Sequence, residues 1–440
     1  MRIIVAAFLD GSWEPTAMAA RAHHDLGLLT VRREIDFGGT EPYVWLHRAA
    51  DLVADTFVAP PRSELRAMRV LVAEHAAPAI LPLLDHPIAG PHTGTALVSS
   101  AMSEPRWPVV HLDTVGDVAA ALGLLPTQLS WFADVASLEQ SVTDERLRHY
   151  RYRWVAKSGS GQRLVEAPKQ TLRRVQRWVL RRVLHNIPVH PATHGFVPGR
   201  SVHTYVGPHV GRRVVVSLDL RNFFTSVAAG RVFGIFRVAG YADSVAHTLT
   251  GLMTNAVPAD ILRGHPDAPR ALRFPHLPQG APTSPALANL AAFSLDRRLS
   301  GLATAMDLRY TRYADDLAFS SAGGLSRRAR RRLVVTVEEI ARAEGFDVNR
   351  AKTRAATAGR QQRLAGRVVN AVDNAPRRDY DRLRAVLHDA SINGPVAANR
   401  EGHPAFEAHL RGRIHWVASD SPARQRRLWQ LFDQIDWSEG

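Results

Sequence analysis

The sequence predicts an α+β fold in which antiparallel strands and amphipathic helices alternate irregularly along the chain. Three observations support this prediction. Tyr150–Lys157 alternates between apolar and polar residues, and a Ser-Gly-Ser-Gly turn separates it from Arg163–Pro168 as the return strand of a β-hairpin. Val214–Leu220 is rich in Val and Leu, as in a buried strand. Between Lys169 and Ile187, apolar residues recur at three- and four-residue steps, as in a helix with one buried face.

The remaining elements follow in order along the chain. Asp113–Leu124 has the pattern of a capped short helix that ends at Gly123, and a second helix is expected to carry Leu129, Trp131 and Phe132. Leu308–Ser320 is expected to form two strands joined at Ala314-Asp315-Asp316. An arginine-rich helix is expected up to Glu344, and the chain from about Pro376 onward is expected to be mostly helical.

The composition favours a polyanionic partner. The chain has 440 residues, of which 56 are Lys or Arg and 41 are Asp or Glu, so its net charge is +15. Neutralisation of phosphates by such an excess releases counterions and supplies binding free energy. A coding bias toward arginine would give the same composition, so charge alone does not decide whether the partner is a polyanion.

The sequence contains no Cys, which excludes disulfides and thiolate metal sites. No segment has the length and apolarity of a membrane helix, so we expect a cytoplasmic protein with no membrane partner.

The helix predicted over Lys169–Ile187 carries a cluster of basic residues. These arginines fall mainly away from its apolar stripe, and no acidic residue accompanies them: Arg173, Arg174, Arg177, Arg181 and Arg182. An ordinary solvated helix face is the alternative interpretation. Contact with a phosphate backbone explains better why only one sign of charge is present.

Three aspartates are the main candidates for catalysis. Asp219 ends a run of Val and Leu, where a charged side chain is costly unless it is paired or binds a metal. Asp315 and Asp316 are adjacent at a predicted turn, and two neighbouring carboxylates repel each other unless a cation lies between them. Oxygen-rich sites of this kind suit Mg²⁺. An isolated Asp-Asp pair would more often be a solvated loop pair, so the surrounding sequence decides the interpretation.

Five motifs resemble those of reverse transcriptases and occur in the same order as in that family. They are His194–Ser201 in the fingers, Ser217–Phe224 around the first aspartate, Leu277–Asn289 with the Gln-Gly-x-x-x-Ser-Pro pattern, Tyr313–Asp316 as the active-site turn, and Gly345–Thr353 with its lysine. The resemblance covers roughly residues 113 to 420. It implies an RNA-directed DNA polymerase with a right-hand fold of fingers, palm and thumb.

The resemblance also implies a division of the chain. It predicts an N-terminal accessory region over 1–112, N-terminal helices and fingers over 113–213, a palm with an inserted fingers segment over 214–375, and a helical thumb over 376–440. The palm is expected to contain an antiparallel sheet.

The resemblance assigns roles to individual residues. Two metal ions, Mg²⁺ with Mn²⁺ as an alternative, are expected on Asp219, Asp315 and Asp316, with the backbone carbonyl of Leu220 completing one coordination shell. The chemistry would be two-metal nucleotidyl transfer. Phe224 matches the aromatic side chain that excludes a ribose 2′-hydroxyl, although it could also be a core residue beside Phe223.

Further residues are expected to contact the nucleotide or the nucleic acid. The nucleotide contacts are Lys157, Arg163, Gln279, Gly280 and Lys352, and Lys352 could protonate the leaving pyrophosphate. Gly280 would let the backbone approach the nucleotide closely. For the basic residues, ordinary surface positions are the alternative. The nucleic-acid contacts are the four arginines Arg173, Arg174, Arg177 and Arg181, together with Arg200 of the fingers motif and Gly366 in the segment that resembles the primer grip.

Within the family, the retron enzymes resemble this chain most. Leu410–Trp416 resembles their thumb segment, whereas Val206–His209 keeps only the His of their Asn-Ala-x-x-His motif, and Leu364–Gly366 replaces their Val-Thr-Gly. Retron membership implies binding of a structured noncoding RNA as template and primer, dNTPs as substrates, a branched RNA–DNA product for phage defence, and an effector protein partner. The alternatives are a defence reverse transcriptase outside the retrons and a catalytically silent RNA-binding scaffold. A group II intron maturase and a diversity-generating enzyme fit the sequence less well.

Overall fold

The structure is a computed structural model that describes residues 101–134, 137–156 and 161–439, together with Met18, Ala19, Ala50, Asp51 and Ala54. The chain divides into two compact units, Met1–Val98 and Ser99–Gly440. The accessory region predicted over 1–112 therefore lies outside the described residues up to residue 100, apart from these five. Of its described end, Met102, Val109 and Leu112 belong to the main hydrophobic core of the second unit.

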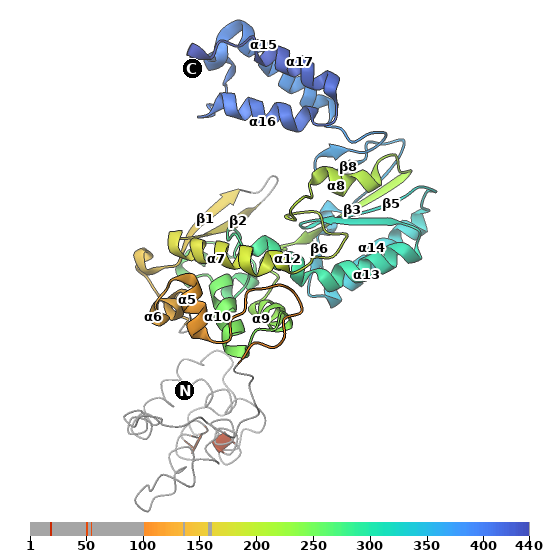
Figure 1. Ribbon diagram of the computed structural model, residues 1–440. Helices are drawn as coiled ribbons and strands as arrows, with labels where there is room; N and C mark the ends of the chain where they lie inside the picture. The colour runs from red at the N-terminus through yellow and green to blue at the C-terminus, as the bar shows by residue number, and fades with distance from the viewer. Residues whose placement is uncertain are drawn as a thin grey trace, which may run out of the picture. The chain divides into compact units, whose positions relative to one another are not determined.

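The second unit is an α+β structure with antiparallel sheets, as predicted (Figure 1). Its helices are α5 (Val115–Leu122), α6 (Pro126–Phe132), α7 (Gln170–Arg182), α8 (Val202–Val206), α9 (Ala229–Val238), α10 (Asp243–Met253), α11 (Ala259–Leu262), α12 (Ser284–Ala291), α13 (Phe293–Ala305), α14 (Arg327–Ala343), α15 (Arg377–Ala398), α16 (Phe406–Ala418) and α17 (Pro422–Phe432). Its strands are β1 (Tyr150–Ala156), β2 (Gln162–Pro168), β3 (Val214–Arg221), β4 (Arg309–Tyr313), β5 (Asp316–Ser321), β6 (Asp347–Val348), β7 (Arg354–Thr357), β8 (Arg363–Leu364) and β9 (Arg367–Val368).

Strand β3 is the centre of a five-stranded sheet. The strand order is β4-β5-β3-β6, and β7 also pairs with β3. Every pairing in this sheet is antiparallel. Two further pairs, β1–β2 and β8–β9, form separate hairpins.

The two faces of β3 pack against different parts of the chain. Val214, Val216, Leu218 and Leu220 belong to the main core, which also includes residues of α13 and α14. Val215 packs on the other face, in a smaller cluster that contains residues of α8. Because successive side chains of a strand point to opposite faces, Asp219 lies on the face of Val215. The fold thus directs this carboxylate away from the main core.

The predicted hairpin, the strands around the Asp-Asp turn and the helices from Asp113 onward are confirmed, with ends that differ by a few residues. The helix predicted over Lys169–Ile187 is wrong at its end. It stops at Arg182, because Val183 leaves helical geometry at φ −120° and a 3₁₀ turn follows over Leu184–Asn186. Val183 and Ile187 are nevertheless buried, so the apolar pattern continued beyond the helix.

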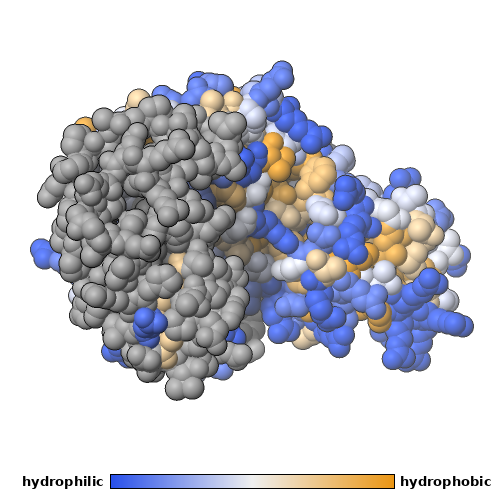
Figure 2. Space-filling view, turned by 90° about the horizontal axis from the view of Figure 1, so that it is seen from below, coloured by the Kyte–Doolittle hydropathy of each residue, from blue (hydrophilic) through white to orange (hydrophobic). Residues whose placement is uncertain are grey.

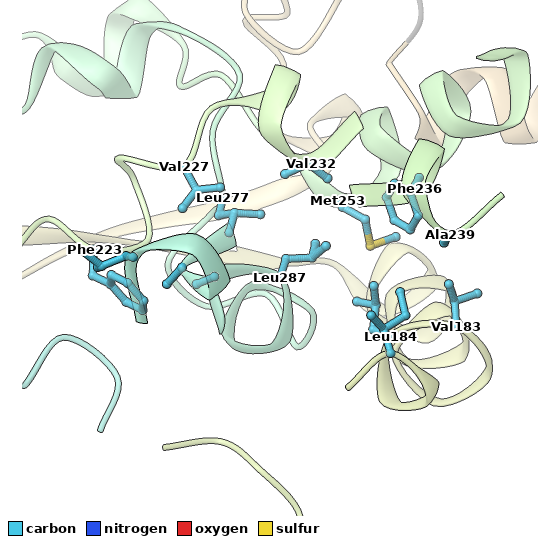
Figure 3. Close-up of a cluster of buried hydrophobic side chains, with 14 of the residues drawn as sticks. Val183, Leu184, Phe223, Val227, Val232, Phe236, Ala239, Met253, Leu277 and Leu287 are labelled. Carbon is cyan, nitrogen blue, oxygen red and sulfur yellow. The ribbon is translucent and has the colours of Figure 1, made fainter. Parts of the chain in front are cut away.

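The main core extends from the central sheet to α7. Figure 3 shows part of it, from Phe223 past Leu277 and Leu287 to Val183 and Leu184. The C-terminal helices α15, α16 and α17 enclose a second core that includes Leu383, Leu387, Leu410, Ile414 and Leu428. Burial of such side chains supplies most of the favourable free energy of folding.

One face of the molecule is drawn in Figure 2 with its residues coloured by hydropathy. In Figure 2, hydrophilic residues cover most of the described part of that face, and hydrophobic residues gather in smaller patches between them. Within the residues that the structure describes, no helix combines the length and the apolarity needed to span a membrane.

Candidate active site

Asp219 and the Asp315–Asp316 turn lie side by side at one end of the sheet. In the antiparallel β3–β5 pair, Asp219 is the register partner of Asp316. The amide of Leu220 donates a hydrogen bond of 2.9 Å to the carbonyl of Asp315. The turn between β4 and β5 requires a left-handed backbone at Ala314, with φ 53°. Asp219 and the adjacent pair Asp315 and Asp316, which is distant from it in the sequence, therefore share one end of the sheet.

The electrostatics of these carboxylates favour a bound cation. Burial, followed by the charges of Asp315 and Asp219, raises the pKa of Asp316 to about 7. Burial and the charge of Asp219 also raise the pKa of Asp315. Each shift reports a cost of ionisation that a divalent cation between the carboxylates would remove.

Lys352 provides a positive charge at the same place. Its Nζ lies 2.8 Å from Oδ2 of Asp219, and this hydrogen bond is the main cause of its raised pKa. The backbone also ties this segment to β3, because the amide of Asn349 donates to the carbonyl of Asp219 over 2.7 Å. The lysine motif and the first aspartate thus form one unit.

A different trio has the tightest cluster of potential ligand atoms. In the described ranges, His203, Asp373 and Asp420 are the group of three whose ligand atoms all lie within 4.8 Å of one another. The buried guanidinium of Arg367 already pairs with both carboxylates, so this cluster is an ion-pair network. The carboxylates of Asp219, Asp315 and Asp316 do not form such a group, as expected for three like charges that repel one another. Their oxygen-only donor set and raised pKa values suit Mg²⁺ better.

A cluster of aromatic rings lies next to the turn that contains Asp315 and Asp316. Phe224 is half-buried, and its ring centroid lies 6.1 Å from that of Phe196. Phe196 also lies 6.4 Å from Tyr313 of the turn that contains Asp315 and Asp316, is 49% exposed and has a left-handed backbone at φ 61°. Sequence reasoning placed Phe196 in a motif but gave it no role. Its signal is structural, because a large exposed ring in a rarely populated conformation usually marks a functional position.

The loop that contains Gln279 and Gly280 is fixed to strand β2. The amide of Glu166 donates to the carbonyl of Gln279 over 2.9 Å. A Cβ on Gly280, which has φ 141°, would lie 2.8 Å from the carbonyl oxygen of Glu166, so only glycine fits. The carboxylate of Glu166 is fully buried and is held by His276 at 3.0 Å and Asn255 at 2.7 Å. The hairpin and the loop that contains Gln279 and Gly280 are therefore held together.

Two basic residues, Lys157 and Arg163, are predicted on the hairpin, and the structure describes only Arg163. Lys157 lies outside the described residues. Arg163 is exposed on β2, opposite Val155, and its guanidinium has no hydrogen-bond or ion-pair partner among the described residues.

The arginines of α7 line a groove of about 820 Å³. The groove is bounded by Arg173, Arg174, Arg177, Trp178 and Arg181 of this helix and by Arg151 of β1. The five arginines of this set are exposed, and none has an acidic partner within the part of the chain that the structure describes. An unpaired basic groove of this size can accommodate a phosphate backbone.

The other predicted nucleic-acid contacts occupy structural positions. Arg200 donates from Nη1 to the backbone carbonyls of Pro191 and Thr193, so it holds its own loop. Gly366 has φ 81° in the turn between β8 and β9, and a Cβ there would lie 3.7 Å from the ring of Trp416.

His209, the histidine retained from the retron motif, is fully buried between Ser320 and Thr311, and burial lowers its pKa to about 3. His209 is therefore a neutral core residue beneath the sheet.

Comparison with known proteins agrees with this geometry. Residues 155–380 match the family model of "Reverse transcriptase (RNA-dependent DNA polymerase)". The chain is 42% identical to the Retron Mx65 reverse transcriptase of Myxococcus xanthus, over 72% of this chain and 70% of that protein. It is 36% identical to the Retron Mx162 reverse transcriptase of the same organism, over 74% of this chain and 68% of that protein. It is 30% identical to the Retron Ec86 reverse transcriptase of Escherichia coli, over 66% of this chain and 82% of that protein. The chain therefore belongs to the reverse transcriptase family, as a retron-type RNA-dependent DNA polymerase.

Proposed function

We propose that this enzyme copies part of a structured noncoding RNA into DNA with two divalent cations held by Asp219, Asp315 and Asp316. The observation that carries the proposal is the register pairing of Asp219 with Asp316, which gathers the three carboxylates at one end of the sheet. The raised pKa values of Asp315 and Asp316 support a cation there. Mg²⁺ fits the oxygen donors best, Mn²⁺ is the alternative, and the carbonyl of Leu220 is a further ligand.

Cations held by the three aspartates would supply Lewis-acid chemistry, which would lower the pKa of the primer hydroxyl and stabilise the leaving pyrophosphate. The chain's own residues supply position and charge. Lys352 lies beside Asp219, so a nucleotide bound at the aspartates would also lie close to its ammonium group. The ammonium group can neutralise or protonate the pyrophosphate as it leaves.

The deoxyribonucleotide would lie between the aspartates and the aromatic rings. Phe224 is the residue that would exclude a ribose 2′-hydroxyl, and its packing against Phe196 and Phe223 supports a fixed ring position. Gln279 and Gly280 would contact the nucleotide through a loop that Glu166 holds in place. Arg163 and Lys157 would bind the triphosphate from the hairpin.

The same reasoning supports a right-hand layout. We assign the fingers with their preceding helices to residues 113–213, the palm with its inserted segment to 214–375, and the thumb to 376–440. The palm would contain the aspartates on its antiparallel sheet. The separate core of α15–α17 supports the thumb assignment.

Nucleic acid would be held mainly through its backbone. The groove of α7, with Arg173, Arg174, Arg177 and Arg181, suits a run of phosphates. Gly366 would help to place the primer end, and Arg200 would act by keeping its loop in shape. Because relatives of this chain are named retron reverse transcriptases, we further propose a branched RNA–DNA product, a role in phage defence, an effector protein as partner, and a cytoplasmic location.

The decisive experiment measures dNTP incorporation by the purified full chain on a primed RNA template with Mg²⁺. We expect Asp315→Asn to lose activity by at least about a thousandfold, because the carboxylate that holds the cation is gone. A matched control is Asp307→Asn, which removes a carboxylate from the tight turn before β4. Retention of activity in Asp315→Asn would refute the metal assignment. Sequencing of the nucleic acid that co-purifies with the chain tests the retron product.

A further inference from the structure

The side chain of Arg312 is fully buried directly before the Tyr313–Asp316 turn. It lies on β4, the edge strand that leads into the turn. A buried guanidinium is costly unless all its donors are paired. The hydrogen-bond partners of its guanidinium group therefore indicate its role.

All five N–H donors of Arg312 have acceptors. Nε and Nη2 bind the two oxygens of Asp296 at 2.8 and 2.7 Å, in the bidentate geometry of a strong ion pair. Nη2 also donates to Oγ1 of Thr193 at 2.9 Å. Nη1 donates to Oδ1 of Asn289 and to the carbonyl of Ala314, both at 3.0 Å. The guanidinium is thus saturated, and one of its bonds reaches the turn itself.

The bond to the Ala314 carbonyl acts on the geometry of the catalytic residues. Ala314 has φ 53°, a conformation that an alanine adopts only when its surroundings enforce it. Its carbonyl belongs to the peptide plane shared with Asp315. Fixing that oxygen therefore fixes the orientation in which the backbone enters Asp315 and Asp316.

The opposite side of the turn is held through the same network. A Cβ on Gly195 would lie 2.6 Å from the amide nitrogen of Ala314, so the fingers motif packs directly on the turn. Asn289 connects the two sides, because its Nδ2 donates to the carbonyl of Gly195 at 2.8 Å while its Oδ1 accepts from Arg312. The guanidinium also lies 5.4 Å from the ring centre of Phe223, which precedes Phe224.

Stability alone explains this arrangement poorly. Asp296 and Arg312 are both fully buried, and replacing such a pair with apolar residues of similar volume is often neutral or stabilising. What an apolar replacement could not supply is a directional bond to the Ala314 carbonyl. The arrangement is suited to positioning.

We propose that Arg312 is a positioning residue of the polymerase, which with Asp296 and Asn289 sets the Tyr313–Asp316 turn in the shape that lets Asp315 and Asp316 share their cations. The proposal rests on the proposed function, because it takes these two aspartates to be metal ligands.

The test is Arg312→Lys in the full chain, assayed by incorporation of a single dNTP on a primed RNA template as Mg²⁺ and dNTP are varied. Lysine keeps the charge but cannot reproduce the five-donor fork. We expect kcat to fall about a hundredfold, as misplacement of reacting groups by about 1 Å does, with a higher half-saturating Mg²⁺ concentration and an unchanged KM for dNTP.

The matched control is Arg148→Lys, because Arg148 is also a buried arginine but pairs with Asp260 and the carbonyl of Val142, far along the chain from the turn. It should lose thermal stability while kcat and Mg²⁺ dependence remain those of the wild type. If Arg312→Lys does not fold, Asn289→Ala tests the same link without removing a charge, and a smaller change in the same direction is expected.

A folded Arg312→Lys enzyme, or Asn289→Ala in its place, with wild-type kcat and Mg²⁺ dependence would overturn the proposal. If Asp315→Asn is inactive in the same assay, that result would leave the metal assignment intact. If Asp315→Asn is active, the proposed function itself fails.

Discussion

The ammonium of Lys352 lies 2.8 Å from Oδ2 of Asp219, although 133 positions separate the two residues in the sequence. The contact brings a positive charge to the carboxylates, and the raised pKa of Lys352 keeps its amine protonated. Lys352 is well exposed, so its side chain is also accessible to a substrate phosphate.

We expect Lys352→Gln to lower kcat by about a hundredfold, because the pyrophosphate would lose a general acid and a neutralising charge. Single-turnover dNTP incorporation measures this effect. Lys352→Arg is the control, since it keeps the charge but transfers a proton poorly, and it should recover only part of the loss. Wild-type rates in Lys352→Gln would exclude the role in proton transfer.

The pKa of Asp316, raised to about 7, predicts a pH-dependent stability in the absence of metal. The folded state keeps a proton on Asp316 that the unfolded state has already released, so the free energy of unfolding falls as the pH rises from about 4 to about 7. A divalent cation binds the ionised form, so Mg²⁺ should raise Tm more at about pH 8 than at about pH 6.

Thermal unfolding with Mg²⁺ and with a chelator tests this pH dependence. In the metal-free Asp316→Asn variant, this fall in the free energy of unfolding with rising pH should be absent. An equal Tm increment from Mg²⁺ at both pH values would contradict the prediction.

Phe224→Ala should weaken discrimination against ribonucleotides. Its ring would no longer occupy the space of a 2′-hydroxyl, so we expect the ratio of kcat/KM for dNTP over NTP to fall about a hundredfold. Phe233→Ala is the matched control, because Phe233 is another half-buried phenylalanine but packs on His247 of α10. A ratio that is unchanged in Phe224→Ala would place this ring in the core.

The groove of α7 should account for part of the salt dependence of RNA binding. Replacing Arg173, Arg174, Arg177 and Arg181 together with Gln should reduce the slope of log affinity against log salt by about 3, since each phosphate contact contributes roughly 0.7 to 0.9. Fluorescence anisotropy of a structured RNA over a salt series measures the slope.

A second arginine-rich helix provides the control for this experiment. Helix α14 presents exposed arginines at Arg327, Arg328, Arg331 and Arg332, so their replacement removes the same net charge elsewhere. An equal loss of slope in both variants would show that only total charge matters, and would argue against the groove as a specific site.

The sequence by itself determined the local elements and pointed to Asp219, Asp315 and Asp316 as the candidate catalytic groups. Strand β3 follows from its run of Val and Leu, and the hairpin follows from its turn residues, because these signals depend only on neighbouring side chains. The helix of α7 was recognised but extended too far. Its apolar positions stay buried through Ile187, and periodicity alone does not reveal that the backbone changes to a 3₁₀ turn at Val183.

The tertiary structure decided which side chains share a space. It paired Asp219 with Asp316, buried Arg312 beside the Tyr313–Asp316 turn, and placed Phe196 beside Phe224. None of these relationships is local, since each depends on strand register and on which faces meet across segments far apart in the chain. The physical reason is that burial and hydrogen-bond satisfaction are properties of the packed molecule, whereas a sequence pattern reports only what each segment prefers on its own.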